Sequence, residues 1–147
     1  GTMPVSAVLA NRDIMEVLHP GQHGSTYGGN PLACAVMMES LEVVREEGLT
    51  ENSERLGKIF RARLESFNHP MLEFVRGKGL FNAIGIRPIG GYTAWDVCLR
   101  MKEAGLLAKP THEHIIRFAP PLVITEEQVL ECCDIIIDAI RSFPVSI

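Results

Sequence analysis

Apolar residues recur every three or four positions along several stretches of the chain. This spacing places them on one side of an α-helix and predicts amphipathic helices. Two of these helices start at residue pairs that can form capping boxes. The pairs are Thr93 with Asp96 and Thr125 with Gln128. The predicted helices cover residues 13–18, 31–47, 51–67, 93–105 and 125–140.

The helix that begins at Pro31 has clear signals at both ends. Asn30 is a favourable N-cap, and Pro31 suits the first helical position because its missing N–H would be unpaired there anyway. Gly48 is placed to end the helix. We expect the apolar face of this helix to be buried, with the residues Cys34, Met37, Met38, Leu41 and Val44.

Short runs of β-branched and other apolar residues predict strands between the helices. The expected strands cover residues 5–10, 72–76, 80–86, 106–109 and 115–118. From about residue 50 the order is helix, strand, strand, helix, strand, strand, helix, which is typical of an α+β domain with a largely antiparallel sheet. We place a domain boundary near Gly48-Leu49-Thr50, and a chain that opens inside a strand suggests part of a larger protein.

Composition and charge narrow the classes of function. A hydrophobic content of 46% with 22% charged residues is ordinary for a globular protein. The net charge of -4 gives no broad attraction to nucleic acid or to an anionic membrane surface. No apolar run reaches the roughly 20 residues of a transmembrane helix. Neither a nucleic-acid nor a membrane partner is therefore expected.

The four cysteines lie in apolar stretches without the spacing of a zinc site or a disulfide, so we expect buried, reduced thiols. Reduced thiols favour an intracellular compartment. The first residues show no targeting signal, and both the mitochondrial matrix and the cytoplasm stay open. No metal site is expected either, because Pro20 and Gly21 keep His19 and His23 from sharing a helical face.

The glycine-rich loop before Asn30 is the first candidate for chemistry. The loop could bind a phosphate or another anion. The donors would be glycine N–H groups and the hydroxyls of Ser25 and Thr26, next to a helix N-terminus. The loop matches neither a P-loop nor the dinucleotide fingerprint. A tight structural turn is an equally good interpretation of these residues.

Arg117 is the second candidate. It stands between the apolar residues Ile116 and Phe118, where an unpaired guanidinium would be costly, so we expect it to have an anionic partner. That partner could be an internal carboxylate or the carboxylate of a substrate, which the planar fork of arginine fits well. Arg76 and Lys78 could also bind an anion, although a turn between two strands with solvated charges is favoured there.

Four segments of the chain occur in the order found in class III aminotransferases, namely Pro4–Val8, His23–Ala33, Val75–Leu80 and Ile116–Leu122. The resemblance covers nearly the whole chain. Within the family, residues 105–124 are most similar to the ornithine aminotransferases.

The family has the type I fold of pyridoxal-phosphate-dependent transferases, with a large α/β domain and a smaller C-terminal α+β domain. The resemblance implies that this chain is a C-terminal part, in which residues 1–49 end the large cofactor-binding domain and residues 50–147 form the small domain. It also implies that the lysine that holds the cofactor lies upstream, which would leave the chain without a catalytic residue and inactive by itself.

The resemblance further implies the roles of three residues. Thr26, with Ser25 beside it, matches the position that contacts the phosphate of pyridoxal 5'-phosphate. In this family the contact crosses the interface of a homodimer with shared active sites. Arg117 matches the arginine that holds the α-carboxylate of the substrate.

The reaction implied for the whole protein is transfer of the δ-amino group of L-ornithine to 2-oxoglutarate, which gives glutamate semialdehyde and glutamate. The substrates would thus be a small amino acid and a 2-oxo acid. Two alternatives stay open: an acetylornithine aminotransferase, and a non-catalytic module that shares the fold and only dimerises or binds a partner.

Overall fold

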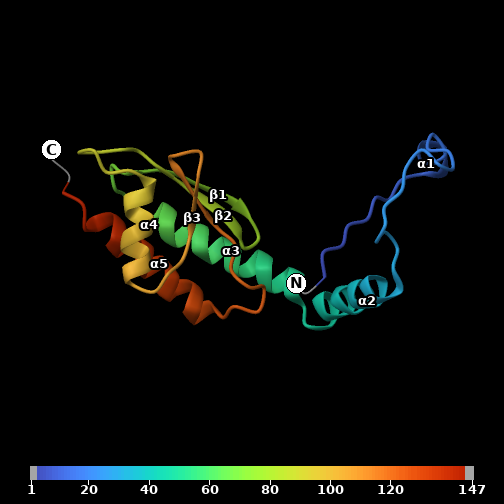
Figure 1. Ribbon diagram of the computed structural model, residues 1–147. Helices are drawn as coiled ribbons and strands as arrows, with labels where there is room; N and C mark the ends of the chain where they lie inside the picture. Colours follow the sequence, from blue (N-terminus) through green and yellow to red (C-terminus); the bar gives the residue numbers. More distant parts are fainter. Residues whose placement is uncertain (1–2, 145–147) are drawn as a thin grey trace. The chain divides into compact units, whose positions relative to one another are not determined.

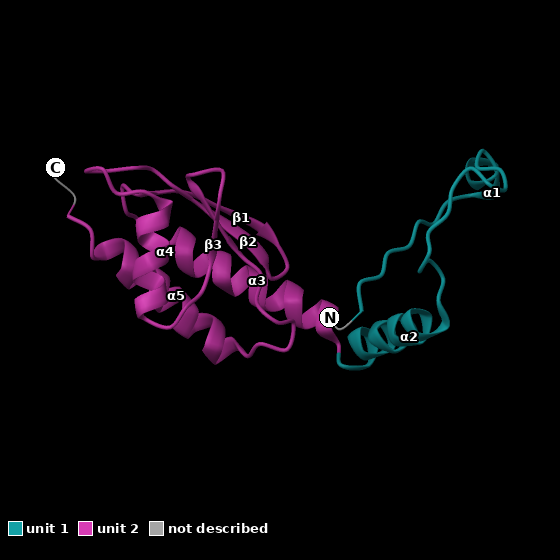
Figure 2. Ribbon diagram, viewed as in Figure 1, with its two compact units in different colours: residues 1–47 teal, residues 48–147 magenta. Residues whose placement is uncertain are grey.

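The computed structural model describes residues 3–144 of the chain. The chain divides into two compact units, one within residues 1–47 and the other within residues 48–147 (Figure 2). We refer to them as unit 1 and unit 2. Their assignment to the large and small domains of the family stays a prediction. No helix within residues 3–144 is long and apolar enough to cross a membrane.

Unit 1 contains a short helix α1 (Arg12–Met15) and a long helix α2 (Pro31–Glu46). The predicted strand over residues 5–10 is wrong, because these residues are exposed and form no strand. A β-prone run becomes a strand only when a neighbouring strand accepts its hydrogen bonds, and no described segment pairs with it. The helix predicted over residues 13–18 is shorter than expected and gives way to turns after Met15.

The local signals around α2 act as predicted. The side chain of Asn30 accepts a hydrogen bond from the backbone N–H of Ala33 at 2.9 Å, and Pro31 occupies the first helical position. Gly48 follows the helix with a φ of 60°, a conformation that glycine adopts without steric cost. Both ends of α2 are therefore set by residues within or next to the helix.

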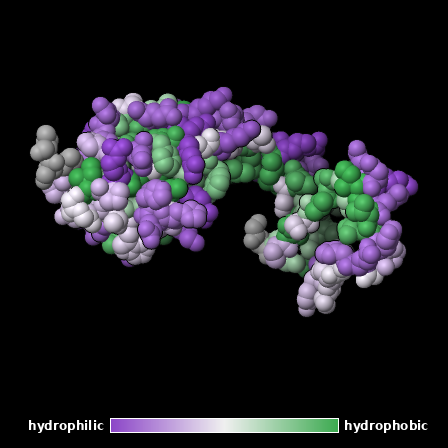
Figure 3. Space-filling model, turned by 90° about the horizontal axis from the view of Figure 1, so that it is seen from above, coloured by the Kyte–Doolittle hydropathy of each residue, from purple (hydrophilic) through white to green (hydrophobic). Residues whose placement is uncertain are grey.

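The burial predicted for α2 is wrong. Ala33 is its single buried residue, whereas Met38 and Leu41 are 66% and 62% exposed. Helical periodicity reports which face would be buried by a partner, but it does not report whether the partner is present. Unit 1 accordingly displays an apolar surface, visible as green residues in Figure 3.

Unit 2 is an α+β unit, as the sequence predicts. Its helices are α3 (Leu49–Glu65), α4 (Ala94–Glu103) and α5 (Glu126–Arg141). Its strands are β1 (Leu72–Lys78), β2 (Phe81–Ile86), β3 (Lys109–Thr111) and β4 (Ile115–Phe118). All strand pairs are antiparallel, and the order across the four-stranded sheet is β1-β2-β4-β3. The three helices cover one face of this sheet (Figure 1).

Two strand limits differ from the prediction. Gly77 and Lys78 belong to β1 rather than to a connecting loop, so that the turn to β2 is shorter than expected. The strand predicted over residues 106–109 lies instead at Lys109–Thr111. Pairing decides its position, since Thr111 stands opposite Ile115 and Lys109 opposite Arg117 across a tight turn.

A single apolar core lies between the sheet and the helices of unit 2. Strands β2 and β4 contribute alternate residues to it, and α3 and α5 contribute residues at helical spacing. The capping box at the start of α5 is formed as predicted: Thr125 and Gln128 exchange backbone-to-side-chain hydrogen bonds of 3.0 and 3.2 Å. The fully buried core side chains include Leu56, Leu64, Ile84, Ile86, Met101, Ile116, Ile136 and Ile140.

Helix α3 approaches the turn between β1 and β2 very closely. A Cβ atom added to Gly57 would lie 1.8 Å from the carbonyl oxygen of Gly79. Beside this contact, the hydroxyl of Ser53 accepts a hydrogen bond from the N–H of Leu80 at 3.0 Å. Glycine at position 57 therefore allows the helix and the turn to touch through their backbones.

We expect Gly57→Ala to destabilise unit 2, although alanine in a helix interior ordinarily adds about 1 kcal/mol of stability relative to glycine. The new methyl group would collide with Gly79, and such overpacking costs about 1–3 kcal/mol or more. Urea unfolding followed by circular dichroism measures the change. Gly24→Ala is the control, because nothing lies within 4 Å of its added Cβ. Unchanged or raised stability of Gly57→Ala would contradict the close contact.

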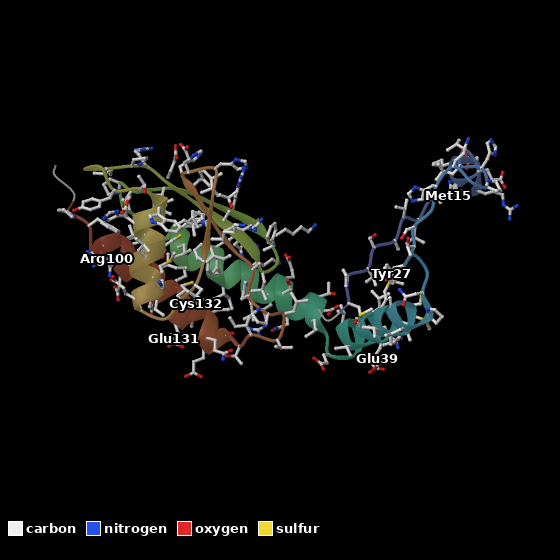
Figure 4. The ribbon with its side chains drawn as sticks, in the orientation of Figure 1. Met15, Tyr27, Glu39, Arg100, Glu131 and Cys132 are labelled. Atoms are coloured by element: carbon white, nitrogen blue, oxygen red, sulfur yellow. The ribbon has the colours of Figure 1, made fainter. Side chains whose placement is uncertain are left out.

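The four cysteines are free thiols, of which Cys98 and Cys133 are buried and Cys34 and Cys132 half-buried. The prediction of buried thiols thus holds for two of them. Burial raises the pKa of Cys98 to about 11 and that of Cys133 to about 12. Cys132 also has a raised pKa, because it is partly desolvated and lies next to Glu131 on α5 (Figure 4).

We expect Cys98 and Cys133 of the native chain to resist a thiol reagent at about pH 8, since the thiolate is the reactive form. Titration with Ellman's reagent should release no more than two equivalents per native chain. All four thiols should react after denaturation in guanidinium chloride, which is the internal control. Release of three or four equivalents without denaturant would show that the core of unit 2 is open.

Candidate functional site

The loop before α2 is held by its own side chains. The hydroxyl of Ser25 accepts a hydrogen bond from the N–H of Gly28 at 2.9 Å. The amide of Asn30 donates to the carbonyl of Tyr27 at 2.8 Å, while its oxygen caps α2. Gly29 has a φ of 70°, which permits the chain to turn into the helix. The loop is therefore a structured turn, as one of the two interpretations of the sequence expected.

A structured turn does not exclude binding of an anion. Thr26 lies exposed at the tip of this turn, and within the described residues neither its N–H nor its hydroxyl has a hydrogen-bond partner. Ser25 uses its oxygen as an acceptor and keeps its hydroxyl proton to donate. Two hydroxyl donors thus stand side by side near the N-terminus of α2, where negative charge is favoured.

A hollow of unit 1 adjoins this loop. Its lining includes Ser25, Tyr27, Asn30 and Cys34 together with residues of the opening segment 3–6. Tyr27 is 80% exposed and lies beside α2 (Figure 4). No local pattern in the sequence indicates this hollow, because its lining depends on how the opening segment runs past α2.

The apolar setting expected for Arg117 from its sequence neighbours is wrong. Its neighbours Ile116 and Phe118 are buried, but Arg117 itself is exposed. Successive side chains of a strand point to opposite faces of the sheet, so an arginine between two core residues faces outward. Of the two partners considered for Arg117, the internal carboxylate is not found: no described Asp or Glu forms an ion pair with Arg117.

Arg117 stands in a row of residues that crosses the whole sheet. Arg76 on β1 is opposite Ala83 on β2, Ala83 is opposite Arg117 on β4, and Arg117 is opposite Lys109 on β3. Opposite residues of antiparallel strands point to the same face. The row therefore lies on the face of the sheet that the helices leave uncovered.

The structure brings Arg117 together with the basic residues of β1. Arg76, Lys78, Phe81 and Arg117 line the same hollow. The sequence analysis treated Arg76 and Lys78 as solvated charges of a turn, and it did not connect them with Arg117. The connection needs the strand register, which no local pattern in the sequence reports.

The candidate residues are thus distributed over both units. Ser25 and Thr26 belong to unit 1, and Arg117 belongs to unit 2. The lysines of the chain, Lys58, Lys78, Lys102 and Lys109, all lie in unit 2 as well. The roles implied for Ser25, Thr26 and Arg117 by the family resemblance stay predictions.

Known proteins resemble this chain over nearly its whole length. The chain is 56% identical over 146 residues to an ornithine aminotransferase of Emericella nidulans, an alignment that covers 98% of this chain and 32% of the relative. The chain therefore spans about a third of the length of that relative.

Solved structures share the fold. An acetylornithine aminotransferase from Elizabethkingia anophelis superposes with a TM-score of 0.83 at 56% identity, over 92% of this chain and 36% of the other. An ornithine aminotransferase from Toxoplasma gondii, which has partial occupancy of PLP at its active site, gives a TM-score of 0.82 at 44% identity, over 88% and 31%. These neighbours confirm the predicted fold class, a part of the type I fold of pyridoxal-phosphate-dependent transferases.

The family model for class III aminotransferases matches residues 1–140. This match extends through both units and includes the loop with Ser25 and Thr26 as well as the strand with Arg117. Together with the high identity to the fungal relative, it establishes that the chain belongs to the class III aminotransferase family.

Proposed function

We propose that the protein containing this chain is an ornithine aminotransferase. The reaction would transfer the δ-amino group of L-ornithine to 2-oxoglutarate and yield glutamate semialdehyde and glutamate. The observation that carries the proposal is the 56% identity to a fungal ornithine aminotransferase over 98% of this chain. The exposed guanidinium of Arg117, free of any described ion-pair partner, supports it because both substrates carry an α-carboxylate that such a group can bind.

The residues of the turn before α2 fit the phosphate of pyridoxal 5'-phosphate. Thr26 would donate from its hydroxyl and its N–H, and Ser25 would donate its remaining hydroxyl proton. The partial positive charge at the N-terminus of α2 would favour the phosphate further. When bound, the cofactor supplies the electron sink that transamination requires.

Ser25 and Thr26 would serve the active site of a neighbouring subunit in a homodimer. Support comes from the exposed apolar residues of unit 1, since surfaces of this kind mark protein interfaces. Val8, Leu9 and Leu32 are 81%, 95% and 65% exposed. A homodimer that shares its two sites would cover such a surface and bring the turn close to a second chain.

Arg117 would bind and orient the substrate. Its fork can donate two parallel hydrogen bonds to a carboxylate, which fixes the direction of the bound molecule as well as its position. The family resemblance implies that the cofactor is attached to a lysine in a motif that Lys58, Lys78, Lys102 and Lys109 do not match. We therefore assign the chain a binding role and expect no turnover from it alone.

An acetylornithine aminotransferase is the second candidate, because the Elizabethkingia anophelis enzyme is also 56% identical to this chain. The two substrates share the α-carboxylate and differ in whether the α-amino group is acetylated. A third possibility, a non-catalytic module, would use the same surfaces only for association.

Co-expression of the chain with the upstream portion of an ornithine aminotransferase tests the proposal. We expect recovery of δ-transamination, measured as glutamate semialdehyde formed from L-ornithine and 2-oxoglutarate. The chain alone is the control and should be inactive. A preference for N-acetylornithine would favour the second candidate, and soluble assembly without any turnover would favour the non-catalytic module.

Thr26→Ala should weaken cofactor binding in the assembled enzyme. Loss of a hydrogen bond to a charged phosphate costs about 1.5–3 kcal/mol, or roughly 10- to 100-fold in the Kd for pyridoxal phosphate. Quenching of protein fluorescence by the cofactor measures this constant. Thr26→Ser keeps the hydroxyl and should bind nearly normally. An unchanged Kd for Thr26→Ala would remove the phosphate assignment.

Arg117→Gln should raise the KM for the amino acid by roughly 10- to 100-fold, because the charge-assisted contact to the α-carboxylate is lost. Cofactor affinity should stay unchanged. Arg117→Lys keeps the charge without the fork and should give an intermediate KM. Arg55→Gln is the matched control, since Arg55 pairs with Glu126 on the surface at 2.6 Å. Equal KM values for the Arg117 and Arg55 variants would contradict this role.

A further inference from the structure

Phe81 differs from the other large apolar residues of the sheet. In strands β1 to β4, all of which the structure describes, it is the single large apolar side chain that is exposed, with an exposed fraction of 60%. The residues on either side of it, Leu80 and Asn82, are both 3% exposed. Since single exposed apolar residues are common on protein surfaces, the position of Phe81 is informative only through what its ring touches.

The helical side of the sheet fixes the direction of Phe81. In the turn before it, the N–H of Leu80 donates to the hydroxyl of Ser53 on α3 at 3.0 Å. Asn82 accepts a hydrogen bond from Arg61 of the same helix at 2.8 Å. Because successive side chains of a strand point to opposite faces, anchoring Asn82 toward α3 directs the ring of Phe81 to the face that the helices leave uncovered.

On that face the ring of Phe81 meets the guanidinium of Arg117. The guanidinium carbon lies 5.9 Å from the ring centroid. This is within the distance of about 6 Å at which a cation is attracted to an aromatic face. Both side chains line the same hollow. A contact of this kind restrains a guanidinium and leaves its N–H donors free for a ligand.

Arg117 is not held by an ion pair. Its side chain is exposed, and no described Asp or Glu pairs with it. An arginine side chain without restraint populates many rotamers, and ordering it when a ligand binds costs conformational entropy. A group that already holds the guanidinium in one orientation lowers this cost. Phe81 is suited to do so, because its own backbone is anchored from the other face.

The other strand arginine that contacts a ring differs in this respect. The guanidinium carbon of Arg76 is 5.2 Å from the ring centroid of Phe74. That ring lies against the backbone of Gly85, where an added Cβ would be 2.3 Å from it, so Phe74 fills space above a glycine of the sheet. Phe81 belongs neither to the apolar core nor to the residues packed against it. Its contact with Arg117 is therefore not a by-product of core packing.

We propose that Phe81 is a positioning residue, whose ring holds the guanidinium of Arg117 in the orientation that receives the carboxylate of a substrate. The inference rests on the proposed function for the role of Arg117 and adds the residue that orients it. Phe81 acts through Arg117, so its effect falls on substrate binding. Cofactor binding and kcat do not depend on it.

Kinetics of the enzyme assembled with the upstream portion test this role. Phe81→Leu keeps an apolar side chain without the ring, and we expect the KM for the amino acid to rise about two- to fivefold at nearly unchanged kcat. Phe81→Tyr keeps the ring and should keep the KM of the unmodified chain. Trp95→Leu is the matched control, because Trp95 is an aromatic residue of α4 with a similar exposed fraction of 58%, and it should change neither constant.

NMR spectroscopy of the 147-residue chain measures the contact without activity. The ring current of Phe81 should displace the Nε–H resonance of Arg117, which is assigned by its loss in Arg117→Gln. In Phe81→Leu this resonance should move toward that of a solvated arginine, whereas in Phe81→Tyr and Trp95→Leu it should stay. The amide spectrum of each variant checks that the fold is intact.

A double-mutant cycle decides whether Phe81 acts through Arg117. In the Arg117→Gln background, Phe81→Leu should leave the KM unchanged, because the group that the ring positions is gone. A further rise of the same size would show that the ring contacts the substrate itself, which overturns the positioning role. An unchanged KM for Phe81→Leu in the native background would also overturn it and leave the proposed function standing. An unchanged KM for Arg117→Gln would instead remove the proposed role of Arg117, and the positioning role with it.

Discussion

The contact between α3 and the turn that joins β1 to β2 holds the sheet of unit 2 against its helices. Gly57 and Gly79 meet there through their backbones, which no larger residue at position 57 would allow. Asn82 is buried beside this contact, where it accepts a hydrogen bond from Arg61 at 2.8 Å and donates to the carbonyl of Gly79 at 3.1 Å. Its polar atoms are thereby satisfied, so the turn, and β2 with it, is fixed in place.

The position of β2 determines the position of the candidate site. Asn82 is opposite Phe118 and Ala83 is opposite Arg117, so the strand anchored at the turn sets the register of β4. The alternation of side chains then directs Ile116 and Phe118 to the core and Arg117 to the open face. The core residues that stabilise the fold and the residue proposed to bind substrate therefore depend on the same strand.

Much of the fold could be predicted from local signals. The capping residues Asn30 and Thr125 begin helices where expected, and the order of elements after residue 48 predicted an α+β unit. The signals failed where a distant partner was needed, as at the exposed segment 5–10 and along the exposed face of α2. Apolar periodicity describes what a segment could bury, and only a packed neighbour decides whether it does.

The sequence by itself determined the starts of α2 and α5, the family and the residues Ser25, Thr26 and Arg117 as candidates, because each depends on a short run of neighbouring residues. The tertiary structure decided that Arg117 faces outward, and that it shares a hollow with Arg76 and Lys78, which are about 40 residues away along the chain. Strand register produces this proximity, since it depends on hydrogen bonds and packing between distant segments rather than on any local pattern.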